Sequence, residues 1–317
     1  MGGVSQEEIT FVSTDGMSKV HGYIWWPSPE HELMGVVQIV HGMCEHIERY
    51  DGFARWLAAA GFVVAGHDQV GHGQTTPRDQ WGVLPAKTGR DVLVGDVQRL
   101  RELVSSKAPG VPYFVFGHSM GSFVVRAYLS EHATGLAGAV ICGTGFVKPA
   151  TSRLGNRLAC LIASVRGDAA KSNLLHSMAD GPYSKAIPNA KTDFDWLSHN
   201  EENVQRYIAD PACGFMFSAG GYATLTQLTA EVCVPECTKA YPAALPLLYI
   251  GGAEDPVGDC GKGVREAADL ARSTGSTDVT CTVYDGMRHE ILNETGHERV
   301  FADVLAWLQS KLPQKEA

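Results

Sequence analysis

Apolar residues recur along the chain with two different periods, and these predict strands and helices in alternation. Short runs rich in valine, isoleucine and aromatic residues are typical of strands, which we predict near residues 8–13, 19–26, 35–40, 62–67, 112–117, 138–144, 245–250 and 279–284. Apolar residues three and four positions apart predict helices near residues 46–60, 90–107, 120–133, 261–274 and 297–311. From the third strand on, strands alternate with helices. This order is typical of the α/β class, with a mostly parallel sheet flanked by helices.

The interval 147–240 interrupts the alternation. It is too long for a simple connection between two strands, and it contains helical signals of its own. We therefore predict that it is an inserted helical cap over one core, whose two parts are residues 1–146 and 241–317.

One predicted helix of the cap carries an apolar stripe. Its members fall at helical spacing and are Leu154, Leu158, Leu161, Ile162 and Val165. Two interpretations stay open. The stripe packs on the core, or part of it lines an acyl tunnel or touches a lipid surface.

Composition limits the classes of function. The chain has 317 residues, and its net charge of −9 argues against a nucleic-acid partner. The eight cysteines lack the regular spacing of a disulfide framework, and free thiols are a simpler interpretation than a Cys233–Cys237 bridge. The N-terminal residues lack an apolar signal segment, and no apolar run is long enough to span a membrane. We expect a cytoplasmic protein with at most peripheral contact to membranes; the oligomeric state is not encoded in any recognisable pattern.

A nucleophile motif lies between a predicted strand and a predicted helix. Residues 117–121 read Gly-His-Ser-Met-Gly, with Ser119 at the turn. A serine on such a sharp elbow has a strained backbone, and neighbouring chain would collide with side chains two positions before and after it. Gly117 and Gly121 meet that requirement, so we predict that Ser119 is a nucleophile. His118, inside the elbow, is expected to be a packing residue.

A serine nucleophile needs a general base and an orienting acid, and both follow it in the expected chain order. Asp255 comes directly after the strand near 245–250, where the carboxyl ends of parallel strands gather functional groups. His289 lies in the loop after the last strand. We predict that Asp255 orients His289 and that His289 is the base. The other candidates weighed are Glu254, Asp259 and Asp285 for the acid and His297 for the base.

Acyl transfer also needs backbone N–H groups that stabilise an oxyanion. One is expected from Met120, directly after the nucleophile, and the other from Met43 in the loop after the third strand. The same loop gathers potential metal ligands, namely His41, Cys44, Glu45 and His46. Their spacing fits no zinc pattern, so we predict no metal.

Three motifs together resemble the monoacylglycerol lipase and lysophospholipase group of the α/β-hydrolase superfamily. They are His-Gly-x-x-Glu-His-x-x-Arg-Tyr at 41–50, Gly-His-Asp-Gln-Val-Gly-His-Gly-Gln at 66–74, and Gly-His-Ser-Met-Gly at 117–121. The resemblance spans about residues 8 to 312. Carried over by motif, it implies the same triad and oxyanion donors: Ser119, Asp255, His289, Met43 and Met120. Met43 and Cys44 replace the small residues that many members have after His-Gly.

The resemblance implies hydrolysis of a single-chain lipid ester, most simply a monoacylglycerol, without a cofactor. A lysophospholipase or a general carboxylesterase is the main alternative. An aminopeptidase would use the same triad but needs cap carboxylates for the substrate ammonium; the candidates are Asp193, Asp195, Glu201 and Glu202. A non-catalytic ligand-binding protein is a further alternative.

Overall fold

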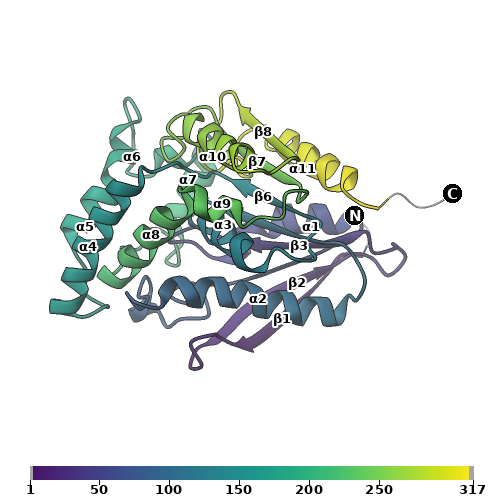
Figure 1. Cartoon of the computed structure of the whole chain (residues 1–317), viewed down its shortest axis with the longest axis horizontal. Helices are drawn as coiled ribbons and strands as arrows, with labels where there is room; N and C mark the ends of the chain where they lie inside the picture. Colours follow the sequence, from purple (N-terminus) through teal and green to yellow (C-terminus); the bar gives the residue numbers. More distant parts are fainter. Residues whose placement is uncertain (1–2, 314–317) are drawn as a thin grey trace.

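The computed structural model describes residues 3–313. Residues 1–2 and 314–317, at the outer ends of the two predicted core parts 1–146 and 241–317, lie outside the described residues. Eight strands form one sheet in the order β1-β2-β4-β3-β5-β6-β7-β8 (Figure 1). Strand β2 is antiparallel to β1 and β4, and all pairs from β3 to β8 are parallel. The predicted α/β fold with a mostly parallel sheet is therefore confirmed.

The observed strands match the predicted runs to within a few residues. They are β1 (Ser5–Val12), β2 (Lys19–Trp26), β3 (Gly35–Val40), β4 (Phe62–His67), β5 (Tyr113–His118), β6 (Gly138–Cys142), β7 (Leu247–Gly252) and β8 (Val279–Tyr284). The helices of the core are α1 (Asp51–Ala59), α2 (Gly89–Lys107), α3 (Met120–His132), α10 (Lys262–Ser273) and α11 (Glu298–Ser310).

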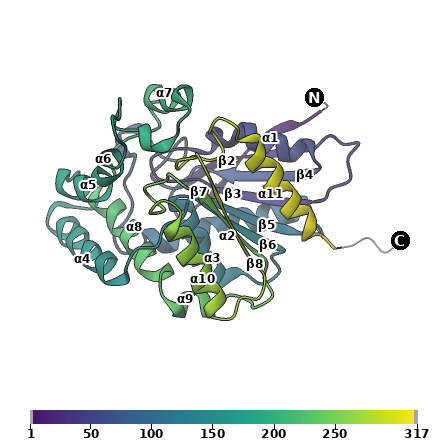
Figure 2. The ribbon, with the colours of Figure 1, turned by 90° about the horizontal axis from the view of Figure 1, so that it is seen from above.

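Helices cover both faces of the sheet (Figure 2). On one face, α2, α3 and α10 pack in a cluster that includes Val97, Val124 and Ala267. On the other face, α1 and α11 pack around Phe53 and Val304. Strands β3 to β7 are buried throughout, which explains their continuous apolar runs.

The chain before α1 differs from the prediction of one helix over 46–60. A 3₁₀ helix spans Ile47–Tyr50, and α1 begins only after it. The side chains of Arg49 and Tyr50 both turn back to the carboxylate of Glu45. Because these bonds tighten the first turn, the regular helix starts later than its apolar period suggests.

Six helices lie between β6 and β7, within the interval predicted as a cap. They are α4 (Pro149–Arg166), α5 (Asn173–Ala179), α6 (Gly181–Lys185), α7 (Glu201–Ala209), α8 (Ala219–Val232) and α9 (Pro235–Lys239), with a 3₁₀ turn at Asp195–Leu197. Helices α4 and α5 lie at the end of the molecule away from both termini (Figures 1 and 2).

The apolar stripe of α4 does not pack as a unit on the core. Leu154, Leu161 and Val165 are 69%, 61% and 76% exposed. Helix α4 instead packs against α8, and its buried positions include Ala159 and Ala163. Small side chains let the two helices approach closely, and this close packing turns the larger residues outward.

Two general features of residues 3–313 bear on the sequence analysis. All eight cysteines are free thiols, so the 233–237 pair forms no bridge. Within the same residues, no helix combines the length and the apolarity that crossing a membrane requires.

Candidate active site

Ser119 lies at the turn between β5 and α3, with φ 53° and ψ −121°. Its left-handed backbone is rare for a residue with a side chain and stores strain. A Cβ on Gly117 would come within 2.4 Å of the carbonyl oxygen of Gly121, and one on Gly121 within 2.1 Å of that of Val40. Only glycine fits at both positions, as the motif predicted.

Asp255 and His289 meet below the surface beside this turn. Asp255 follows β7 and His289 follows β8, and His289 Nδ1 lies 2.9 Å from Asp255 Oδ2. The side chains are 0% and 2% exposed. Because an ionised carboxylate only accepts, the bond fixes the proton of a neutral imidazole on Nδ1 and leaves Nε2 as the acceptor.

Ser119 and His289 both approach the end of β6, at Cys142 and Gly143 respectively. The amide of Ser119 donates to the carbonyl oxygen of Cys142 at 3.0 Å, and a Cβ on Gly143 would lie 3.3 Å from Cε1 of His289. The Ser119 side chain is half-buried and its hydroxyl has no hydrogen-bond partner in the described chain. The predicted base therefore lies next to the end of β6, which also binds the amide of the predicted nucleophile.

Two aromatic rings enclose His289. The ring of His118 lies 4.8 Å from it and the ring of Trp196 lies 5.2 Å from it. His118 therefore packs, as expected, but its packing partner is the predicted base itself. Trp196 belongs to the insertion, so this segment covers the imidazole.

The electrostatics of the two histidines differ. Burial opposes protonation of His289, but the charge and hydrogen bond of Asp255 outweigh it and raise the pKa of His289. Burial lowers the pKa of His118 to about 4, and the neighbouring His289 adds to this effect. At neutral pH His118 is therefore uncharged and does not compete for the proton that His289 would carry.

The loop after β3 approaches the serine from the other side. A Cβ on Gly42 would lie 3.1 Å from Cβ of Ser119. The N–H of Gly42 donates to Glu45 Oε1 at 2.5 Å. No described residue accepts a hydrogen bond from the N–H of Met43 or of Met120, the two predicted oxyanion donors.

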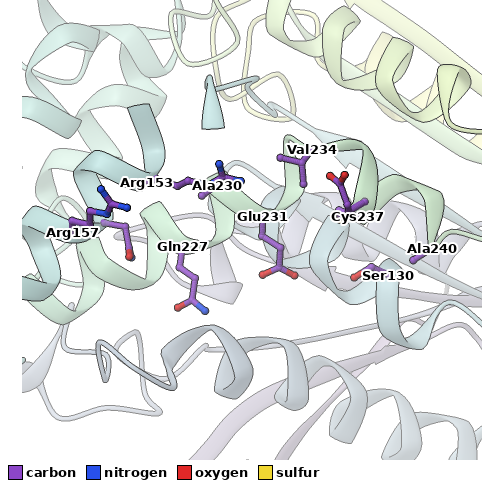
Figure 3. A pocket seen from close by; sticks show the side chains of 11 residues that line it. Ser130, Arg153, Arg157, Gln227, Ala230, Glu231, Val234, Cys237 and Ala240 are labelled. Atoms are coloured by element: carbon purple, nitrogen blue, oxygen red, sulfur yellow. The ribbon is translucent and has the colours of Figure 1, made fainter. Parts of the chain in front are cut away.

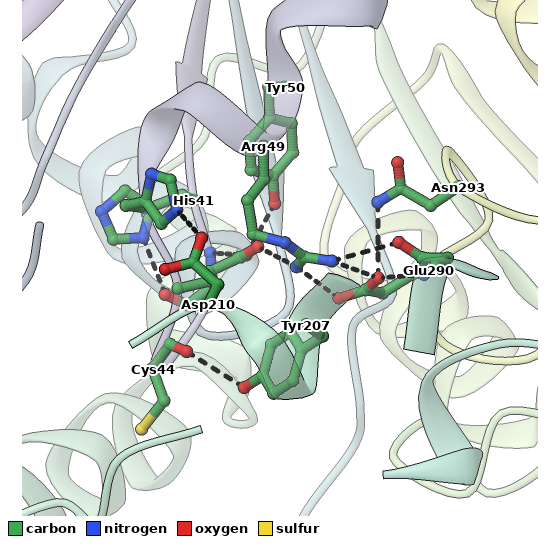
Figure 4. A network of polar contacts seen from close by, with 12 residues as sticks. His41, Cys44, Arg49, Tyr50, Tyr207, Asp210, Glu290 and Asn293 are labelled. Atoms are coloured by element: carbon green, nitrogen blue, oxygen red, sulfur yellow. Dashed lines mark hydrogen bonds and ion pairs between the residues drawn. The ribbon is translucent and has the colours of Figure 1, made fainter. Parts of the chain in front are cut away.

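A buried ionic network holds this loop (Figure 4). Arg49 donates to Glu45 Oε2 at 2.7 Å and to both carboxylate oxygens of Glu290, at 2.5 and 2.7 Å. Asn203 of α7 donates to Glu290 Oε2 at 2.7 Å, and Tyr207 stacks on the guanidinium of Arg49. The network thus joins the 41–50 motif, the loop after His289 and the insertion.

Residues of the 66–74 motif form hydrogen bonds with the loop after β3. The N–H of Gln69 donates to Nε2 of His41 at 3.0 Å, so Nδ1 of His41 carries the proton and donates to the carbonyl oxygen of Gly42. Asp68 accepts from the N–H groups of Ile47 and Gln74. Two of the three motifs that carry the resemblance therefore position the loop that contains Met43.

The other acids and bases weighed in the sequence lie elsewhere. Asp259 and Asp285 are exposed, and Glu254 is exposed and binds His199. His297 packs on Phe301, with its Nδ1 at 2.8 Å from the carbonyl oxygen of Glu294.

The insertion supplies site residues that sequence reasoning missed. Trp196, Asn203 and Tyr207 lie in an interval without a strand period, and no local motif marks them. Their helix-forming context was readable, but the contact of Trp196 with His289 and those of Asn203 and Tyr207 with the 41–50 loop depend on how the insertion folds back.

A separate hollow of about 540 Å³ lies between α4, α8, α9 and α3 (Figure 3). Its walls include Arg153, Arg157, Glu231 and Cys237. None of the predicted triad or oxyanion residues lines it, so it is distinct from the site around Ser119.

Comparison with known proteins gives a family and relatives that match most of the chain. Residues 31–296 match the family model described as serine aminopeptidase, S33. The chain is 29% identical over 309 residues to the monoacylglycerol lipase of Mycolicibacterium smegmatis, covering 97% of this chain and 99% of the relative. It is 26% identical over 303 residues to the human monoglyceride lipase, covering 95% and 89%.

Solved structures of an esterase and a lipase share the fold of this chain. A thermostable carboxyl esterase from Bacillus coagulans, in complex with glycerol, is 32% identical and superposes with a TM-score of 0.87 over 96% of this chain and 98% of that one. A soluble variant of the Saccharomyces cerevisiae monoglyceride lipase, 21% identical, superposes with a TM-score of 0.77 over 97% and 96% of the two chains. The chain therefore belongs to the serine aminopeptidase S33 family, in the monoacylglycerol lipase group of the α/β-hydrolase superfamily, and is a carboxylic ester hydrolase.

Proposed function

We propose that the protein hydrolyses monoacylglycerols to glycerol and a fatty acid, with Ser119 as nucleophile, His289 as base and Asp255 as orienting acid. The observation that carries the proposal is the buried hydrogen bond between His289 and Asp255 beside a serine on a strained elbow. The names of the relatives support the substrate class.

The reaction would proceed in two steps. Ser119 Oγ attacks the ester carbonyl carbon while Nε2 of His289 takes the hydroxyl proton, which then passes to the departing glycerol oxygen. A water molecule, deprotonated by His289, attacks the acyl-enzyme, and the fatty acid leaves as Ser119 regains its proton. The N–H groups of Met43 and Met120 would stabilise the oxyanion, each by a factor of about 10²–10³.

The network around Arg49 supports this role of Met43. Glu45 occupies the N–H of Gly42, which leaves the next N–H along the chain as a free donor near Ser119. We infer that the buried charges fix the loop in advance, so that no reorganisation is needed when the oxyanion forms.

We also propose that residues 147–240 act as a cap that selects the substrate and contacts lipid surfaces transiently. Trp196 covers His289, and exposed apolar side chains of α4 and α5 point away from the core; they are Leu154, Leu161, Val165, Leu174 and Met178. Arg153, Arg157 and Arg166 are exposed on α4 and could meet anionic headgroups.

The aminopeptidase alternative finds less support in the cap carboxylates. Glu201 pairs with Lys191, Asp195 accepts from Thr192, and Glu202 lies 3.5 Å from Arg206. Engaged with their own neighbours near the surface, these groups are poorly placed to receive a substrate ammonium. A lysophospholipase remains the main competitor, because it cleaves the same acyl ester.

A substrate panel tests the proposal. We would compare 1-monoacylglycerols, lysophosphatidylcholines, p-nitrophenyl esters and an aminoacyl anilide, using wild type, Ser119→Ala and, as control, Ser130→Ala on the same helix. Fastest turnover of monoacylglycerol, lost only in Ser119→Ala, is expected. Preference for lysophosphatidylcholine or the anilide would overturn the proposal that monoacylglycerol is the substrate. A wild type without activity would favour a ligand-binding role.

A further inference from the structure

Three side chains of metal-binding type converge outside the predicted triad. They are His46, Asp210 and Cys213, whose ligand atoms all lie within 4.8 Å of one another. Nε2 of His46 is 2.8 Å from Oδ2 of Asp210. In the sequence, His46 stands with potential ligands of its own loop, whereas Asp210 and Cys213 are far along the chain.

The backbone around the cluster is fixed by bonds of its own. Asp210 caps the turn after α7 by accepting from the N–H of Ala212, and its carbonyl accepts from the N–H of Cys213. The N–H of Gly214 and the hydroxyl of Tyr207 both donate to the carbonyl oxygen of Cys44, at 3.0 Å. The segment after α7 is therefore seated against the loop that carries His46.

We propose that His46, Asp210 and Cys213 bind a transition-metal ion of the Zn²⁺ class. An imidazole nitrogen, a carboxylate oxygen and a thiolate sulfur form a donor set that suits zinc, with water as a fourth ligand in a tetrahedral site. On binding, the ion replaces the proton of the Cys213 thiol, which leaves to solvent. None of the three is a predicted triad or oxyanion residue, and the proposal is independent of the substrate.

Exposure and charge both suit a cation. The Asp210 and His46 side chains are 34% and 13% exposed, so an ion can enter from solvent, while Cys213 is buried and lines the inner side. Glu48 Oε2 is 3.9 Å from Nδ1 of His46, the ring nitrogen that does not face Asp210, and adds a second carboxylate charge beside the imidazole.

The positive charge of Arg49 near the cluster does not exclude a bound metal ion. Arg49 is bound by Glu45 and Glu290, so two buried carboxylates already compensate its charge. The polar network in Figure 4 includes Asp210 on the side of Cys44. A bound ion would link the loop before α1 to the segment after α7, and we expect it to hold the insertion against the core.

Cobalt binding tests the site directly. The chelator-treated full chain would be titrated with Co²⁺, and the thiolate-to-cobalt charge-transfer absorption recorded, followed by displacement with Zn²⁺. The band is expected in wild type and in Cys260→Ser, which alters an exposed thiol elsewhere. It should be absent in Cys213→Ser, and Zn²⁺ should raise the melting temperature of wild type but not of that variant.

Asp210→Asn provides a second variant at a half-exposed position, should Cys213→Ser fail to fold. We expect it to weaken Co²⁺ binding by about tenfold or more. A wild type without the band, a band that persists in Cys213→Ser, or unchanged affinity in Asp210→Asn would each overturn the proposal and indicate adventitious binding.

Discussion

Arg49 binds Glu290, the residue directly after His289, through both terminal nitrogens of its guanidinium. The same side chain also binds Glu45, which lies in the loop between β3 and the 3₁₀ helix that precedes α1. Burial opposes ionisation of Glu290, but Arg49 lowers its pKa to about 2. One cation therefore fixes two loops, and each loop carries a residue proposed to act in catalysis.

Replacing Arg49 should destabilise the fold strongly. Arg49→Met leaves two buried carboxylates without their partner, and we expect a loss of about 3–5 kcal/mol in the free energy of unfolding. Arg55→Met is the matched control, because its ion pair with Asp51 is about 40% exposed and should contribute less than about 1 kcal/mol. Urea denaturation of both variants measures the difference; equal losses would contradict the role of the network.

The contribution of the Arg49–Glu290 pair should also depend on pH. Because the folded-state pKa of Glu290 is lowered from 4.5 to about 2, the stabilisation is complete above about pH 4.5 and is lost as pH falls toward 2. The stability difference between wild type and Arg49→Met should shrink over that interval. A difference that stays constant down to pH 2 would argue against the ion pair as its source.

Asp255 should matter far more for turnover than for substrate binding. In Asp255→Asn the proton of His289 is no longer held on Nδ1, and we expect kcat to fall about 10⁴-fold with a small change in KM. Glu254→Gln, next in the chain but exposed, should retain nearly full activity. Comparable losses in both variants would point to a general effect of this loop.

The pH profile of the hydrolysis should reflect the raised pKa of His289. The base acts only when neutral, so kcat/KM should fall as pH drops through a value above the ordinary 6.5. Removing the charge of Asp255 should move this acid limb to lower pH, and the rate of Ser119 labelling by a fluorophosphonate can follow it in the slow variant. An unchanged limb would mean that another group controls it.

Local patterns predicted the sheet and the residues at its carboxyl edge. Ser119 and Asp255 follow the buried strands β5 and β7, and His289 follows the half-buried edge strand β8, and in all three strands apolar period and turn residues are strong signals. Trp196 and Tyr207 could not be found in this way, because their positions depend on how the insertion packs. The α4 stripe was ambiguous for a similar reason, since its packing face follows from the small residues that α8 contacts.

Gly121 of the nucleophile elbow allows a steric test of the turn. Gly121→Ala places a Cβ 2.1 Å from the carbonyl oxygen of Val40, in rigid backbone, and we expect a destabilisation of about 1–3 kcal/mol with loss of activity. Gly52→Ala in α1 meets no atom within 4 Å and should be neutral or stabilising by up to about 1 kcal/mol. Thermal unfolding and ester hydrolysis distinguish the two; a stable, active Gly121→Ala would show that the elbow can relax.

Exposed apolar residues on α4 should control binding to membranes. Leu161 and Val165 are 61% and 76% exposed, and replacing both by aspartate removes apolar surface and adds negative charge. We expect partitioning into anionic vesicles to fall about tenfold or more, since burying one such side chain is worth about 1.5–3 kcal/mol. Met17→Asp, at an 88% exposed residue between β1 and β2, is the control and should bind as wild type does. Hydrolysis of a soluble short ester should be unchanged in both variants, because neither alters the site around Ser119. Equal vesicle binding by all three proteins would place the membrane contact elsewhere or remove it.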